Sequence, residues 1–314
     1  MKKLFLAISI ACAISTTTFA ETGDTQIDPV LNYWEKVDKN YASEMHKVNL
    51  QEATAIEQEK YSTPEERYVA GLFFYADKDY TDKKRAFKQF KIAHQLGFGP
   101  ATYMYGKMLV TGESGNKNLF LGRNVLQSVS GDNYYEYQAN KFLAEQYLQE
   151  KNFEAAIAHY QKMKTRESTY QIAKVLEYKG ETEKAFLLYK QAIGEGYIEA
   201  KIELAKRLLN RDVLDTQKAI ALLTEVSDKG QDLERVSEAQ TLLGDIYFKG
   251  NQSMYADAHK GVEWYKKAAN NGNHEALIKL HAIYSENESN DKYRLGKNKD
   301  YIHELSKKIY KNLY

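Results

Sequence analysis

The sequence predicts an all-α protein built of stacked helical hairpins, an α/α solenoid. Degraded copies of one pattern recur at spacings of 29 to 39 residues along most of the chain. Within each copy, apolar residues recur at the three- and four-residue steps of a helix. One hairpin cannot bury its own apolar face, so units of this length stack on their neighbours. The copies align on their first small position, which is occupied by Glu65, Ala101, Ala139, Ser168, Ala200, Ala239 and Ala276.

The first helix of each copy carries an apolar packing stripe that includes two small positions. In the clearest copy the stripe consists of Ala239, Leu243, Gly244 and Tyr247, which fall on one face of a 3.6-residue period. The small positions let neighbouring helices approach closely. The second helix carries a small residue, then an aromatic or leucine pair, then a small pair. We expect left-handed turns after several of these second helices, where glycine costs least, at Gly97, Gly196, Gly230 and Gly272.

This pattern resembles the Sel1-like repeat family, a relative of the tetratricopeptide repeats. The best match runs from Ala239 to Ala276, and the copies 101–139 and 200–239 follow. The two short copies within 139–200 lack the loop between helices and are closer to ordinary tetratricopeptide units. The resemblance implies a right-handed superhelix of about six hairpins that acts as an adaptor, with no catalytic residues and no cofactor.

The sequence divides into four segments: a signal peptide at 1–20, an N-terminal capping helical segment at 21–64, the repeats at 65–284, and a loop with a C-terminal capping helix at 285–314. The capping segments carry apolar residues at helical steps and would cover the exposed ends of the repeat stack. The polar, asparagine-rich stretch from Ser285 to Lys299 predicts the loop before the last helix.

The first twenty residues predict export and cleavage after Ala20. Lys2 and Lys3 give a charged start, the apolar stretch that follows is too short to span a bilayer, and small residues precede Glu21. Cys12, the only cysteine, lies inside this segment, and the residues before it lack the leucine of a lipoprotein signal, so we expect no lipid anchor. The mature chain would be periplasmic, with no disulfide and no transmembrane segment.

Catalytic motifs fail on inspection, so we expect no enzyme and no metal site. His274 and Glu275 begin like a zinc-protease helix, but Ile278 stands where the second ligand is required. His281 could share a face with His274, yet no third ligand lies in register. The segment Gly112–Gly115 is one residue short of a nucleophile elbow and follows an expected helix rather than a strand.

The helix face opposite the packing stripe supplies the candidate binding residues. Positions 2 and 6 of the first helices point away from the stripe, toward the surface that is concave in such superhelices. Tyrosine offers rigid contact area and lysine offers electrostatic steering, which favours an acidic or extended segment of a partner protein. The alternative interpretation is an ordinary solvated helix face. These residues, which we call the predicted stripe, are Arg67, Tyr103, Lys107, Lys141, Tyr170, Lys174 and Lys206.

The leading functional expectation is a periplasmic adaptor for protein–protein interactions that assembles or regulates a cell-envelope machine, such as a secretion apparatus or a polysaccharide exporter. A module that binds cell-wall glycan through the same stripe and a secreted host-contact factor remain alternatives. The missing acid/base pair disfavours a hydrolase. The formal net charge is +1 and becomes −1 when Lys2 and Lys3 are removed, so no global basic field favours nucleic acid.

Overall fold

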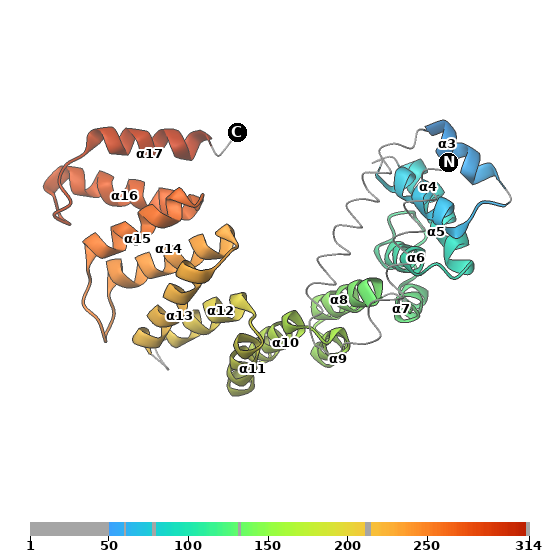
Figure 1. Cartoon of the computed structure of the whole chain (residues 1–314), viewed down its shortest axis with the longest axis horizontal. Coiled ribbons are helices and arrows are strands. Elements are labelled where there is room, and N and C mark those ends of the chain that lie inside the picture. Colours follow the sequence, from blue (N-terminus) through green and yellow to red (C-terminus); the bar gives the residue numbers. More distant parts are fainter. Residues whose placement is uncertain (1–49, 60, 77–79, 131–132, 211–214, 312–314) are drawn as a thin grey trace. The chain divides into compact units, whose positions relative to one another are not determined.

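The computed structural model describes residues 50–59, 61–76, 80–130, 133–210 and 215–311, and within these ranges the chain forms α-helices and no β-strand (Figure 1). Two compact units, Met1–Gly180 and Glu181–Tyr314, make up the chain, and each is described by itself. The predicted signal peptide with Cys12, and most of the predicted N-terminal cap, lie outside the described residues. The predicted all-α hairpin fold is confirmed, and the four segment boundaries stay predictions.

Consecutive helices of the first unit pack on each other as hairpins. α4 packs on α5, α6 on α7 and α8 on α9, while α5 packs on α6 and α9 on α10 to join one hairpin to the next. α3 covers α4, as a capping helix does. The helices are α3 (Leu50–Gln58), α4 (Pro64–Ala76), α5 (Tyr80–Gln95), α6 (Gly99–Thr111), α7 (Leu119–Gln127), α8 (Asn133–Gln149), α9 (Phe153–Met163) and α10 (Arg166–Tyr178).

The second unit repeats this arrangement. α12 packs on α13, α14 on α15 and α16 on α17, and α13 packs on α14 and α15 on α16 between the hairpins. In this unit the residues that begin the copies, Ala200, Ala239 and Ala276, each lie in the first helix of a packed pair. The helices are α11 (Thr182–Gly194), α12 (Ile198–Leu208), α13 (Thr216–Lys229), α14 (Leu233–Lys249), α15 (Ala258–Asn270), α16 (His274–Asn290) and α17 (Lys299–Lys311).

Short polar side chains begin many of the helices. Asn118 accepts a hydrogen bond from the Leu121 amide at the start of α7, at 2.9 Å. Thr165 and Ser168 form a reciprocal capping box at the start of α10. Such side chains satisfy backbone N–H groups that have no partner in the first turn. The connections between helices are thus fixed by local sequence.

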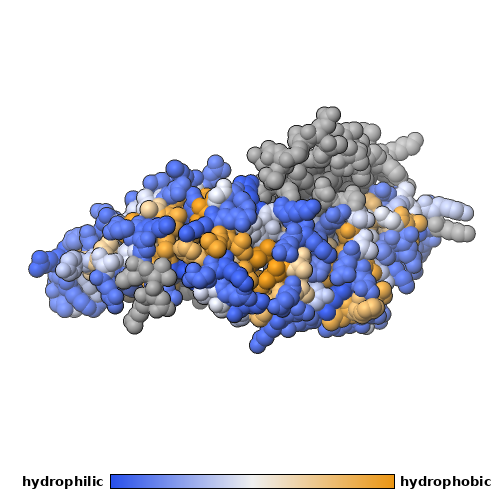
Figure 2. Space-filling view, turned by 90° about the horizontal axis from the view of Figure 1, so that it is seen from below, coloured by the Kyte–Doolittle hydropathy of each residue, from blue (hydrophilic) through white to orange (hydrophobic). Residues whose placement is uncertain are grey.

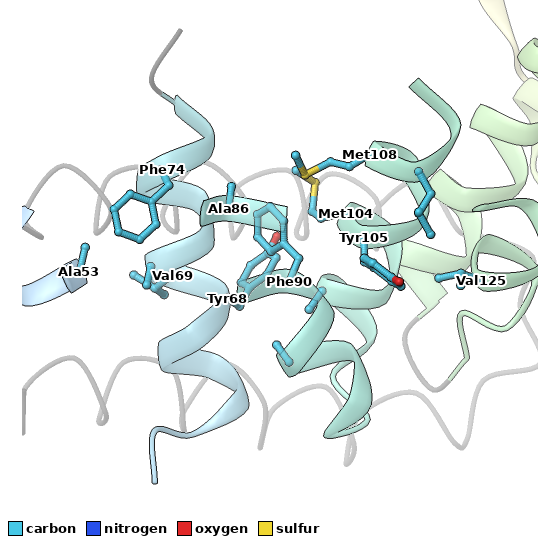
Figure 3. Packing of buried hydrophobic residues seen from close by; sticks show 14 residues of the cluster. Ala53, Tyr68, Val69, Phe74, Ala86, Phe90, Met104, Tyr105, Met108 and Val125 are labelled. Carbon is cyan, nitrogen blue, oxygen red and sulfur yellow. The ribbon is translucent and has the colours of Figure 1, made fainter. Parts of the chain in front are cut away.

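Tyrosine, phenylalanine and small residues fill the core between the paired helices. Tyr68 of α4 and Phe90 of α5 lie against each other with ring centroids 5.7 Å apart (Figure 3). A Cβ added to Gly71 would stand 2.5 Å from the Phe90 ring, and one added to Gly244 would stand 2.5 Å from the ring of Tyr265. The expected role of the small positions, close approach of two helices, is confirmed at Gly244, and Gly71 allows the same approach one residue after Ala70, the small position of its copy.

The expected left-handed glycines are found with one exception. Gly97, Gly196 and Gly272 have φ values of 84°, 85° and 87°. Gly230 instead has φ −67° and ψ 137°, so the left-handed expectation is wrong there. The chain leaves α13 in an extended conformation because Asp232, two residues later, already caps α14. Gly230 is still sterically required, since a Cβ would lie 2.5 Å from the Val226 carbonyl oxygen.

The connection before the last helix is shorter than the sequence suggests. α16 continues to Asn290, past Ser285, where the polar stretch predicted a loop. The reason is that Leu280, Tyr284 and Asn287 continue one buried face of the helix. The Asn287 side chain is completely buried and anchors the following turn. The helix therefore continues through this polar stretch because Asn287 is buried and hydrogen-bonded.

Candidate functional site

Two members of the predicted stripe belong to the core of the first unit. Arg67 is 6% exposed and donates hydrogen bonds to Gln89 Oε1 at 2.9 Å and to the Glu59 carbonyl at 2.5 Å. Tyr170 is 8% exposed. These two side chains offer almost no surface to a partner, because position 2 of their helices faces a neighbouring element.

Tyr103 and Lys107 on α6 are half-buried. The Tyr103 ring packs against Tyr135 with ring centroids 5.9 Å apart. Lys107 forms no ion pair within the described part of the chain. Part of this face is therefore available to solvent, with one cation that no carboxylate neutralises.

Two lysines of the predicted stripe are already engaged by carboxylates. Lys141 forms an ion pair with Glu167 at 2.7 Å. Lys206, in the second unit, pairs with Glu203 and Glu238, each at 2.9 Å. Burial alone would lower the pKa of Lys206, but the hydrogen bonds that it donates to the two carboxylates raise this pKa above its usual value. These lysines hold helices together and contribute little free positive charge.

Lys174, the remaining member, is exposed and lies at the edge of a cleft. The cleft has a volume of about 380 Å³ and lies between the end of α8, the start of α9 and α10. We call it the α8–α10 cleft. Four of its lining residues are apolar or aromatic and four are polar or basic. They are Leu148, Phe153, Val175 and Tyr178, and Gln149, Lys151, Gln171 and Lys174.

The α8–α10 cleft combines an apolar wall with positive charge. Tyr178 is 83% exposed, and its ring centroid lies 6.3 Å from that of Phe153. Neither Lys151 nor Lys174 forms an ion pair among the described residues, and the cleft is lined by no acidic residue. An exposed aromatic ring beside two unneutralised cations suits an apolar side chain flanked by carboxylates.

Two acidic residues that adjoin lining residues in the sequence are bound to cations outside the cleft. Glu150 pairs with Arg123 at 2.6 Å, and Glu154 pairs with Lys179 at 2.9 Å. They cannot neutralise the cleft lysines without giving up these contacts. The positive charge of the cleft is therefore available to a partner.

Sequence reasoning found Lys174 but missed the apolar residues beside it. Tyr178 lies one helical turn after Lys174, on the same face of α10. Extending the predicted stripe by one turn would have found Tyr178. Phe153 and Leu148 come from another hairpin, and nothing in their local sequence places them beside α10.

The histidine motif of the second unit forms no metal site. The His281 Nε2 atom lies 3.0 Å from the Ser306 hydroxyl of α17, which gives that ring a structural contact. The His274 Nδ1 atom is buried without a hydrogen-bond partner among the described residues. No group of three or more His, Cys, Asp or Glu side chains able to hold a metal ion occurs in the described part of the chain.

The short glycine segment after α6 is a helix-terminating turn. Gly112 has φ 78° and ends α6, and the Gly115 amide donates to the Gly112 carbonyl at 2.9 Å. The Ser114 hydroxyl is buried and has no hydrogen-bond partner among the described residues. A nucleophilic serine requires an adjacent base, so this serine lacks the partner that would activate it. Glu113 instead accepts a hydrogen bond from Tyr75, whose pKa is raised first by burial and then by that carboxylate.

Charged and polar residues dominate the molecular surface, with smaller apolar areas between them. Figure 2 shows this for one face, where orange residues are surrounded by blue ones. No helix in the described ranges combines the length and the apolar composition that crossing a membrane requires.

Comparison with known proteins identifies the repeat. The Sel1 repeat family model matches residues 138–165 and 237–273. The second match covers the expected best copy and corresponds to α14 and α15. The first corresponds to α8 and α9, rather than to the copies 101–139 or 200–239 that the sequence pattern ranked next. No curated protein matches the chain.

Comparison with solved structures finds similar proteins at low sequence identity. The C-terminal part of a tetratricopeptide repeat protein from Cytophaga hutchinsonii has a TM-score of 0.51 at 14% identity, covering 80% of this chain and 98% of that one. A protective antigen of uropathogenic Escherichia coli with an SLR fold has a TM-score of 0.49 at 19% identity, covering 79% of this chain. This chain spans 54% of the length of that antigen.

A Sel1 repeat protein from Oxalobacter formigenes has a TM-score of 0.45 at 17% identity, covering 90% of this chain and 99% of that one. The Cytophaga structure supports the fold alone, and the repeat itself is identified by the family model. The matched segments and the paired helices agree with the motif found in the sequence. The chain therefore contains Sel1 repeats in these two segments, within an α-helical fold in which paired helices stack as hairpins in each unit.

Proposed function

We propose that this protein is an exported interaction module that binds an acidic segment of a cell-envelope protein at the α8–α10 cleft. In this role it assembles or regulates an envelope machine such as a secretion apparatus or a polysaccharide exporter. Sel1 repeats indicate a protein–protein interaction module, and repeats of this kind are generally not catalytic. The site, the compartment and the partner are the proposal.

The observation that carries the proposal is the chemistry of the cleft. An apolar wall with the exposed Tyr178 lies beside Lys151 and Lys174, while the neighbouring carboxylates are bound to other cations. Aromatic residues in small pockets supply binding energy, and unpaired cations increase the rate of encounter with an acidic partner. The partner segment would place one apolar side chain in the cleft and carboxylates on both sides.

The proposed compartment rests on the first twenty residues. Lys2 and Lys3, the short apolar stretch and Ala20 have the order of a signal peptide. Fractionation of cells that express the full chain with a C-terminal tag tests this point. We expect the mature chain in the periplasmic fraction, with Glu21 as its first residue by mass spectrometry. A chain that keeps Met1 and stays in the cytoplasm would contradict export.

Charge reversal tests the cleft. The double variant Lys151→Glu, Lys174→Glu changes the two cleft cations, and Lys88→Glu, Lys91→Glu is the matched control on exposed lysines of α5. Partners are first identified by in-cell crosslinking and mass spectrometry, and the purified partner is then titrated against each full-length variant. We expect at least about a tenfold loss of affinity for the cleft variant, about 1.4 kcal/mol, and little change for the control.

Salt and helicity separate the possible outcomes. Binding that depends on the two lysines should weaken as ionic strength rises, because salt screens exposed charges. Circular dichroism should show equal helix content in both variants. Equal loss of affinity in the cleft and control variants would refute the cleft as the site. A crosslinked product that is glycan rather than protein would favour the alternative of a glycan-binding module.

A further inference from the structure

A second surface in the second unit lies between two interhelical connections. One connection joins α14 to α15, the other joins α16 to α17, and both appear at the left of Figure 1. Between them lies an open groove of about 690 Å³. Phe248 and Tyr293 form part of its lining, with ring centroids 5.0 Å apart. The exposed Tyr255 and Arg294 also line this groove, which we call the two-loop surface.

The first connection is held in one conformation by hydrogen bonds. Asn251 and Met254 bond to each other through their backbones, at 2.8 and 3.3 Å. The side chains of Asn251 and Ser253 both donate to the Thr216 hydroxyl of α13, at 2.7 and 2.8 Å. The next residue, Tyr255, is 97% exposed. A fixed backbone therefore presents a large aromatic side chain to solvent.

The second connection is fixed just as firmly. The Asn287 side chain is completely buried, accepts the Tyr293 amide at 2.9 Å and donates to the Gly296 carbonyl at 3.0 Å. Asp291 and Arg294 have φ values of 49° and 55°. Residues other than glycine seldom adopt positive φ values. The hydrogen bonds of Asn287 hold this uncommon backbone in place, so the loop needs little ordering when it binds.

Arg294 is the cation that this surface leaves for a partner. The neighbouring Lys292 already pairs with Glu286 at 2.6 Å. The carboxylate of Asp257, which also lines the groove, accepts a hydrogen bond from the Lys260 amide at the start of α15. Arg294 is exposed and forms no ion pair among the described residues. Its guanidinium can bind a carboxylate with two parallel hydrogen bonds.

We propose that the two-loop surface docks a folded protein that offers an apolar socket to Tyr255 and a carboxylate to Arg294. Tyrosine and arginine are the residue types that most often dominate protein interfaces. Tyr255, which is 97% exposed, and Arg294, which forms no ion pair among the described residues, fit a protein with an apolar hollow and a carboxylate better than a neutral sugar chain, which offers no carboxylate to Arg294. This inference rests on the proposed role as an interaction module but does not depend on the α8–α10 cleft.

Site-specific photocrosslinking tests the docking surface. The full chain carries p-benzoylphenylalanine at position 255 or, as the matched control, at position 310 on α17, where Tyr310 is 65% exposed. Irradiation of intact native cells, followed by mass spectrometry, identifies the crosslinked protein and the segment attached. We expect a product at position 255 that position 310 does not give, attached near an acidic residue of a folded domain. The same products at both positions, or glycan alone, would overturn the proposal.

Affinity measurements with the purified partner complete the test. We expect Tyr255→Ala and Arg294→Glu each to weaken binding at least about tenfold, whereas Tyr310→Ala and Lys307→Glu change it less than about twofold. Exchanging the partner's carboxylate for lysine should restore binding to Arg294→Glu. Absence of this rescue would overturn the assigned pairing. If only the double variant Lys151→Glu, Lys174→Glu loses affinity for the partner, the two-loop surface is refuted and the α8–α10 cleft is supported. If only Tyr255→Ala and Arg294→Glu lose affinity, the cleft is refuted and the two-loop surface is supported.

Discussion

Acidification should destabilise the first unit through His159 on α9. This side chain is 6% exposed, its Nδ1 atom lies 2.9 Å from Asn140 Oδ1, and its ring is stacked on Tyr147 at 5.5 Å between centroids. Burial, together with the positive charges of Lys162 and Arg123, lowers the pKa of His159 to about 4. The imidazole is therefore neutral in the folded chain at neutral pH.

The sign of this pH effect on stability depends on whether the folded or the unfolded state binds the proton at the higher pH. In the unfolded chain the pKa of a histidine is about 6.5, so the unfolded state takes up the proton before the folded state does. The full stability is present above that pH and is lost as the pH falls toward the folded pKa of His159, about 4. Between about pH 7.5 and about pH 5, the linkage relation gives a loss of about 2 kcal/mol from this one residue.

The assay compares the pH dependence of wild type and His159→Phe. Phenylalanine keeps a flat ring against Tyr147 but cannot be protonated. Urea unfolding followed by circular dichroism gives the stability at each pH, and hydrogen exchange of α8 and α9 locates the change in the first unit. His303→Phe, at an exposed position on α17, is the control. Between about pH 7.5 and about pH 5, we expect His159→Phe to lose about 2 kcal/mol less unfolding free energy than wild type. Parallel curves for wild type and His159→Phe would refute the reasoning.

Three further substitutions test a steric contact, a backbone conformation and a helix cap. Gly244→Ala would place a methyl group 2.5 Å from the ring of Tyr265, which is 1% exposed; we expect a loss of about 1–3 kcal/mol in urea unfolding, and wild-type stability would contradict the tight contact. A Cβ added to Gly272 would meet no atom within 4 Å, but this residue has φ +87°. We therefore expect Gly272→Ala to lose only about 1 kcal/mol of stability, from backbone strain alone. A loss as large as that of Gly244→Ala would contradict strain as the only cause. Thr165→Ala removes the capping box of α10 and should cost about 1 kcal/mol, with faster hydrogen exchange confined to the first turn of that helix; unchanged exchange there would count against the cap.

The repeat pattern predicted the helices because the signal is local and periodic. Ala239, Leu243, Gly244 and Tyr247 lie one or two turns apart, so their spacing alone places them on one face of α14. Six of the seven residues that begin the copies lie in the first helix of a packed pair, and the seventh, Ser168, lies in α10, which packs on α9. The polar stretch after Tyr284 misled the expectation for α16, since burial of Asn287 depends on partners that come later in the chain.

The candidate site was predicted only in part, since spacing cannot tell whether a residue on the second face of a helix meets solvent or another hairpin. Arg67, Tyr103 and Tyr170 all stand at position 2 of their helices, yet Arg67 and Tyr170 are buried while Tyr103 is half-buried. Gln89, which binds Arg67, belongs to α5 and lies outside the motif that selected the stripe.

The sequence by itself determined the class of fold, the positions of the hairpins and the identity of the repeat, because each depends on contacts between residues a few turns apart. Only the tertiary structure decided which charges are free. The sequence assigned both Lys141 and Lys174 to the predicted stripe. In the structure Glu167 neutralises Lys141, whereas Lys174 forms no ion pair among the described residues. The groove beside Tyr255 and Arg294 likewise exists because two connections far apart in the chain lie together. Such pairings depend on distances between elements, which periodicity within one helix does not encode.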